Sequence, residues 1–150
     1  MLPGQNSWFM DHPVFSNQYL TCILDDSIPV LKHRWQCSPP LGEFKKGLLA
    51  ILKEYKQYKI DYPNLKWLAD TELLGELSEE DEKWLTSEWD HLLFDEAGVK
   101  VHAVILGPDF FADYPMEKFK SSSERKFQEL GAQLEVFLDE KGAYDWLRSC

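Results

Sequence analysis

The chain has 150 residues, of which 44% are apolar and 14% are aromatic. This length and composition predict one globular domain with a sizeable core, and they exclude an intrinsically disordered chain. The net charge is −10, so nucleic acid is not expected as a partner, because an acidic surface repels its phosphates.

The chain carries no sign of a membrane or secretory address. None of its apolar runs reaches the roughly 18 to 20 residues that a membrane span needs. The N-terminal stretch MLPGQNSWFMDHPVF lacks the basic and apolar regions of a signal peptide. Cys22, Cys37 and Cys150 show no CxxC spacing, which argues against a disulfide framework and a zinc site. We therefore expect a cytoplasmic protein with buried thiols.

The charge is concentrated in residues 70–96, called the acidic segment below. This segment contains eleven acids and one base, Lys83, whereas the rest of the chain balances 15 acids with 15 bases. Such a surface favours a basic protein surface as a partner. The alternative is a solvated helix face whose first turn is rich in acids.

The first elements in chain order are predicted to be an N-terminal tail and a hairpin. Residues 1–17 read as a strap or loose tail. Residues 18–24 and 29–37 are rich in β-branched and aromatic side chains and are joined by the turn-prone sequence DDSI, which predicts two antiparallel strands. The second strand alternates, so we expect one face buried and one wet. The buried face would hold Leu31, His33, Trp35 and Cys37, and the wet face Lys32, Arg34 and Gln36.

A helix is predicted next, with Ser38 as its cap and two prolines in its first turn. The sequence DYPN at 61–64 ends it. Gly47 within this helix suggests close packing on a sheet. The predicted apolar stripe consists of Leu41, Phe44, Leu48, either Ile51 or Leu52, and Tyr55.

The rest of the chain alternates strands and helices. We predict strands at 65–69, 99–106 and 132–138. The helices between them would run from a Ser78 cap to Gly98, and through Met116 and Leu130 to Gly131, with a last helix at 141–149. The order β-β-α-β-α-β-α-β-α predicts an α/β domain over residues 18–150. Its mixed, mainly parallel five-stranded sheet would have an N-terminal antiparallel hairpin and four helices.

The element order and two local sequences resemble the SpoIIAA-like (STAS-like) single-domain proteins of bacteria. The sequences are KWLADTELLGELSEEDEKWL at 66–85 and GVKVHAVIL at 98–106, and the resemblance covers roughly residues 18–148. It implies a non-enzymatic module, as in anti-sigma-factor antagonists, appendages of anion transporters and related lipid-binding modules.

The antagonist branch carries a phosphorylated serine or threonine at the start of a helix, and Ser78 matches that position. The antagonist pattern is similar to Asp-Ser-Ser-Gly, whereas this chain has Leu77-Ser78-Glu79-Glu80. Four consecutive acids would repel a phosphate there. The alternative to a phosphorylation switch is that Ser78 only caps the helix.

Asp70 and Thr71 form the most credible polar site, because they end an inner parallel strand where open α/β sheets bind ligands. Asp109 follows the next strand, so Asp70 and Asp109 would flank one crevice. The alternative is that Asp70 or Thr71 caps the following turn. GxSxG, HExxH, GxGxxG and Walker sequences are missing, so no cofactor or metal is expected. His33 and His102 read as satisfied core histidines.

Aromatic residues supply the remaining candidates, with Phe110, Phe111 and Tyr114 just beyond a strand. Trp84 and Trp89 are five positions apart, about 140° around an α-helix, so both cannot point into the core. We expect one to be exposed at an interface or at the rim of an apolar pocket, unless it covers the edge of the core.

Two functions follow from these features. The first is a non-enzymatic STAS-like regulatory or interaction module, which acts through a protein partner, a homodimer or a small apolar ligand. It would use the acidic segment, with Trp84 and Trp89, and residues 110–114. The alternative is a small enzyme with a crevice at Asp70, Thr71 and Asp109.

Overall fold

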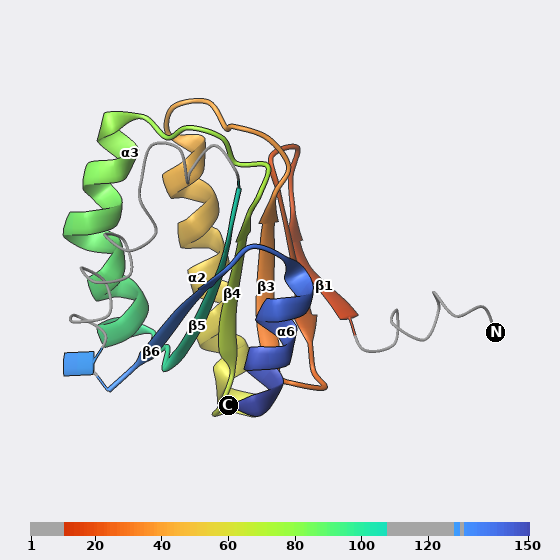
Figure 1. The fold of residues 1–150 in the computed structure, drawn as a ribbon. Helices are drawn as coiled ribbons and strands as arrows, with labels where there is room; N and C mark the ends of the chain where they lie inside the picture. Colours follow the sequence, from red (N-terminus) through yellow and green to blue (C-terminus); the bar gives the residue numbers. More distant parts are fainter. Residues whose placement is uncertain (1–10, 108–127, 130) are drawn as a thin grey trace.

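The computed structural model describes residues 11–107, 128, 129 and 131–150, which form a mixed six-stranded sheet with helices on both faces (Figure 1). The strands lie in the order β1-β2-β3-β4-β5-β6. They are β1 (Asp11–Ser16), β2 (Leu20–Asp25), β3 (Val30–Trp35), β4 (Lys66–Thr71), β5 (Val101–Leu106) and β6 (Gln133–Phe137). The helices are α2 (Glu43–Asp61), α3 (Glu79–Trp84) and α6 (Glu140–Ser149), and α3 continues into the π-helical segments η1 (Leu85–Trp89) and η2 (His91–Glu96). The predicted α/β class is confirmed.

The predicted count of five strands is wrong, because part of the expected tail is a strand. β1 pairs antiparallel with β2 at the edge of the sheet. Its register shifts between Pro13 and Phe15, as is common where a proline lies in an edge strand. Val14 and Phe15 pack against the main core. The sequence did not predict this strand, because the segment is short and contains a proline.

β3, β4, β5 and β6 are parallel, and each pairs with the next strand along the chain. Parallel crossovers are right-handed, so steps in one direction place their helices on one face. α2 and the α3–η2 helix lie on this face, and α6 lies on the other (Figure 1). The sheet therefore has two separate apolar clusters, a large one under α2 and α3 and a small one under α6.

Helix α2 confirms the predicted stripe from Phe44 to Tyr55, but the prediction is wrong for Leu41, which precedes the helix and is exposed, and for the start of the helix. The stripe from Phe44 to Tyr55 is buried, and a Cβ at Gly47 would lie 2.9 Å from Leu20, as close packing on the sheet requires. The helix begins at Glu43 after Gly42, whose φ of 90° cannot continue a right-handed helix upstream. Ser38 is not the cap: its hydroxyl donates to the carbonyl of Leu74.

The α3–η2 helix begins and ends where the sequence predicts. The Ser78 side chain accepts a hydrogen bond from the backbone N–H of Asp81 at 3.1 Å, which is a normal N-cap. Gly98 follows the helix with a φ of 67°. Lys59 Nζ donates to the carbonyls of Ala97 and Gly98, where a cation complements the helix dipole.

The predicted wet face of β3 is confirmed at Gln36, which is exposed, but is wrong at Lys32, which α6 covers, and Arg34 is half-buried. Lys32 is buried, and its ammonium group lies 5.4 Å from the centre of the Tyr144 ring on α6. The expectation of buried thiols holds only for Cys22, since Cys37 and Cys150 are exposed.

Most of the helix predicted through Met116 and Leu130 lies outside the described residues. Within the described part of the chain, every helix is too short or too polar to cross a bilayer.

Candidate functional site

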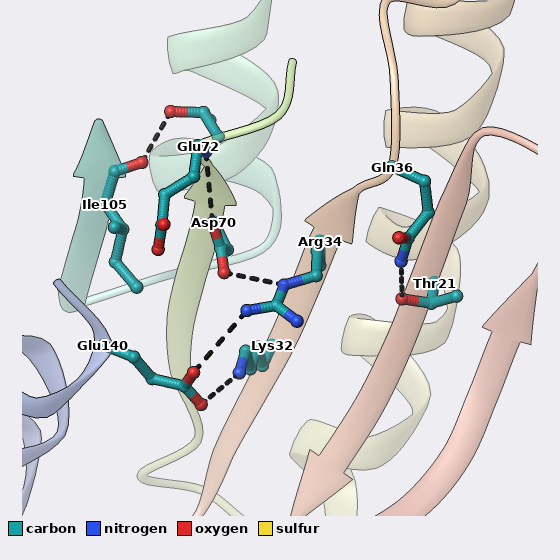
Figure 2. A network of polar contacts seen from close by, with 9 residues as sticks. Thr21, Lys32, Arg34, Gln36, Asp70, Glu72, Ile105 and Glu140 are labelled. Carbon is teal, nitrogen blue, oxygen red and sulfur yellow. Dashed lines mark hydrogen bonds and ion pairs between the residues drawn. The ribbon is translucent and has the colours of Figure 1, made fainter. Parts of the chain in front are cut away.

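Asp70 ends β4 as the most deeply buried carboxylate of the described residues, with a relative exposure of 1%. Its Oδ2 accepts from Arg34 Nε at 2.9 Å, and its Oδ1 accepts from the backbone N–H of Glu72 at 3.1 Å (Figure 2). A buried carboxylate needs such partners. Asp70 thus caps the turn after β4, as the alternative interpretation predicted. It also forms an ion pair with Arg34, which the sequence analysis did not predict.

Arg34 connects Asp70 to α6. Its Nη2 lies 3.6 Å from Glu140 Oε2, and Lys32 Nζ lies 2.5 Å from Glu140 Oε1 (Figure 2). The hydrogen bond that Arg34 donates to Asp70 raises the pKa of Arg34. The four groups form a charge chain from β4 through β3 to the first turn of α6, and their formal charges cancel. We call Lys32, Arg34, Asp70 and Glu140 the charge chain.

Sequence reasoning missed three members of the charge chain, although a signal for Glu140 exists. Glu140, Ala143 and Leu147 recur at three- and four-residue steps and so share one helix face. Ala143 and Leu147 are buried against the sheet, which directs Glu140 toward it as well. Lys32 and Arg34, two cations on one strand face, then need acidic partners.

Thr71 is also used by the fold. Its hydroxyl donates to the carbonyl of Ile105 on β5 at 2.6 Å. The loop after β4 and the end of β5 lie close together, since a Cβ at Gly107 would be 2.6 Å from the carbonyl oxygen of Glu72. β4 and β5 are neighbours, as the crevice hypothesis requires. Asp109 lies outside the described residues, so the crevice stays a prediction.

Trp84 and Trp89 are both buried, with exposures of 8% and 6%, and their ring centres are 5.4 Å apart. The prediction that one of them is exposed is wrong. It assumed α-helical spacing, whereas residues 85–89 form a π-helical turn. Hydrogen bonds from i to i+5 bring residues five apart onto the same face. Any role of these tryptophans in partner binding would therefore act through the shape of the helix.

His33 and His102 are buried in the same aromatic core, as predicted for core histidines. His33 lies edge-on to Trp67 at 5.4 Å, and burial lowers its pKa to about 4. Burial and, to a smaller extent, the nearby His33 together lower the pKa of His102 to about 3. His33 Nδ1 is buried without a hydrogen-bond partner, so its predicted full satisfaction is wrong. A neutral imidazole shut in the core is a poor general acid or base.

The acidic segment is the most exposed of the candidate features. Eight of its eleven acids are exposed: Glu72, Glu76, Glu79, Glu80, Glu82, Glu88, Asp95 and Glu96. Asp70 and Asp81 are buried. The acids occupy the loop after β4 and the length of the α3–η2 helix. The surface can attract cationic groups over the whole helix.

The remaining predicted site residues are Phe110, Phe111 and Tyr114, which lie outside the described residues. Among the described residues, no cluster of three or more metal-ligating side chains is present.

Comparison with known proteins leaves the fold and the site to be interpreted on their own. No family model, curated protein or solved structure matches the chain.

Proposed function

We propose that this protein is a non-enzymatic, STAS-like interaction module that binds a basic surface of a partner protein through its acidic segment. The observation that carries the proposal is the exposure of eight acids along one helix and the loop before it. A single base, Lys83, lies in that segment. Charges that are exposed and of one sign speed association with an oppositely charged partner.

The polar side chains at the ends of the strands support a binding role over a catalytic one. Asp70 is held by Arg34 and the turn after β4, and Thr71 by the carbonyl of Ile105. Groups engaged in this way hold the fold together and leave little capacity for proton transfer. A small enzyme that uses Asp70, Thr71 and Asp109 stays the alternative hypothesis.

The charge of the segment also bears on the kind of partner. A homodimer built on this surface would bring like charges together, which is unfavourable. A different, basic protein is therefore the partner that we propose. The order of strands and helices supports the STAS-like character, and a phosphate on Ser78 would add further negative charge to the same surface.

The experiment reverses charge on the helix without touching its buried side. The variant E82K/E88K/E96K changes three exposed acids. The matched control, D61K/E129K/D145K, changes three exposed acids outside the segment. Both proteins are purified rapidly from the native host, and the partners that they retain are identified by native mass spectrometry.

We expect the control to retain a basic protein that the helix variant loses. Higher salt should release that protein from the wild type. Equal retention by both variants would refute a partner site on the acidic segment. A retained small molecule with no protein would instead favour the apolar-ligand form of the module.

A further inference from the structure

Three leucines are exposed at one end of the sheet. Leu41, Leu73 and Leu138 have exposures of 70%, 58% and 67%. They follow β3, β4 and β6, so all three lie beyond the carboxyl ends of parallel strands. Among the described residues, two other large apolar side chains are exposed. They are Leu49 and Ile60, which lie on α2 instead.

The loops that carry Leu41 and Leu73 are fixed to each other. The Ser38 hydroxyl donates to the carbonyl of Leu74 at 2.5 Å. A Cβ at Gly75 would lie only 2.4 Å from the Ser38 oxygen, so only glycine fits there. The loops run side by side above the sheet (Figure 1). These contacts therefore hold the backbone that carries the two leucines in place, which lowers the entropy cost of binding through them.

The loop of Leu73 also carries exposed acids. Glu72 and Glu76 lie within it, and Glu79 and Glu80 follow at the start of α3. Apolar side chains beside carboxylates match a partner that combines apolar and basic side chains on one element. An amphipathic helix with lysine or arginine beside its leucines has this composition. Anionic lipid headgroups would be repelled by the same acids.

We propose that the leucine edge, formed by Leu41 and Leu73 on the two joined loops, docks the apolar face of a basic amphipathic helix of the partner protein. The acids of the neighbouring loop and of α3 then contact the basic flanks of that helix. This inference rests on the proposed function and specifies the contact. Charge on the acidic segment attracts the partner, and the leucine edge holds it.

The test uses a synthetic helical peptide of about 18 residues, five turns long. It contains only leucine and lysine, with leucine on one face. A second peptide has the same composition in scrambled order, so that it keeps the charge and loses the apolar face. Binding to the full chain is measured by isothermal titration calorimetry. The variants are L41S/L73S and its matched control L49S/I60S, which removes two exposed apolar side chains from α2.

We expect the amphipathic peptide to bind the wild type and the control alike. It should bind L41S/L73S roughly tenfold more weakly, because two apolar contacts are lost. The scrambled peptide should bind weakly and equally to all three proteins. Equal binding of the two peptides to the wild type, or no change in L41S/L73S, would overturn the leucine edge as a docking site.

Two further measurements separate the possible failures. If E82K/E88K/E96K weakens binding and L41S/L73S does not, the acidic segment binds the partner without the leucine edge, and only this inference fails. If neither variant changes binding, the proposed function fails with it. Sedimentation with zwitterionic vesicles that depends on Leu41 and Leu73 would show a membrane contact and overturn the proposal.

Discussion

Helices α2 and α3 cover one face of the sheet with a continuous core of aliphatic and aromatic side chains, whereas α6 covers the other face with a small cluster and a chain of charges. On the first face, Trp67 touches Tyr55, Trp89 and both buried histidines. On the second face, the buried apolar cluster of the described residues is small: Val30, Leu68, Ala103, Ile105, Ala143 and Leu147. The charge chain completes the contact of α6 with the sheet.

The two faces of the sheet are therefore stabilised by different interactions, apolar burial on the first and partly exposed ion pairs on the second. Burial of large side chains stabilises the first face in proportion to the apolar area removed from water. On the second face, Arg34 and Glu140 retain exposures of 41% and 43%, so their attraction is weakened by solvent. α6 should therefore open at a lower free energy than the rest of the domain.

The largest expected effect is a cavity in the first face. Trp67→Ala should lower the free energy of unfolding by about 3 to 5 kcal/mol, because Trp67 is buried at the centre of the aromatic core. Urea denaturation followed by circular dichroism measures it. Trp146→Ala on α6 is the control, since Trp146 is only partly buried. A loss for Trp146→Ala as large as for Trp67→Ala would contradict the comparison.

The second prediction concerns acid. Folded His33 has a pKa of about 4, below its usual value of 6.5. Above pH 6.5, both the folded and the unfolded states are neutral, and stability is unaffected. As the pH falls from 6.5 to 4, only the unfolded state binds the proton, so stability should fall by roughly 3 kcal/mol.

Replacing the imidazole isolates this contribution. His33→Phe keeps an aromatic ring in the core and cannot take up a proton. The free energy of unfolding from urea titrations, measured at several pH values, should fall less steeply below pH 6.5 than in the wild type. Parallel slopes for His33→Phe and the wild type would show that His33 is not shielded from protons.

The smallest expected effect is local to α6. Glu140→Gln removes the charge that pairs with Lys32 and Arg34 and should destabilise the docking of α6 by about 1 kcal/mol. Hydrogen exchange of the α6 amides should become roughly fivefold faster, while exchange in β4 stays unchanged. Asp145→Asn changes the same charge on an exposed pair with Arg148 and serves as the control. Faster exchange in β4 as well would mean that α6 does not open separately.

Local patterns predicted those features whose physical cause lies within a few residues. Ser78 caps its helix because its side chain reaches the N–H of Asp81 three positions on. Gly98 ends that helix because the positive φ suits glycine. Asp70 was correctly placed near the end of a parallel strand, since the alternation of strands and helices alone indicates where parallel strands end.

Three of the failed predictions show how a distant contact or an irregular local pattern decided the outcome. Ser38 did not cap α2 because its hydroxyl bonds to Leu74, 36 positions away. β1 was missed because an edge strand with a proline lacks a regular pattern. The tryptophan pair was placed on two sides of a helix because π-helical spacing is not visible in an α-helical periodicity.

The sequence by itself determined the α/β class, the ends of the α3–η2 helix and the concentration of charge in the acidic segment, since each depends on local spacing and composition. The tertiary structure decided which polar residues are buried and paired. Lys32 and Glu140 are 108 positions apart, and α6 covers Lys32 on the expected wet face of β3. Residues so far apart meet only through the packing of the whole sheet, which a local pattern does not encode.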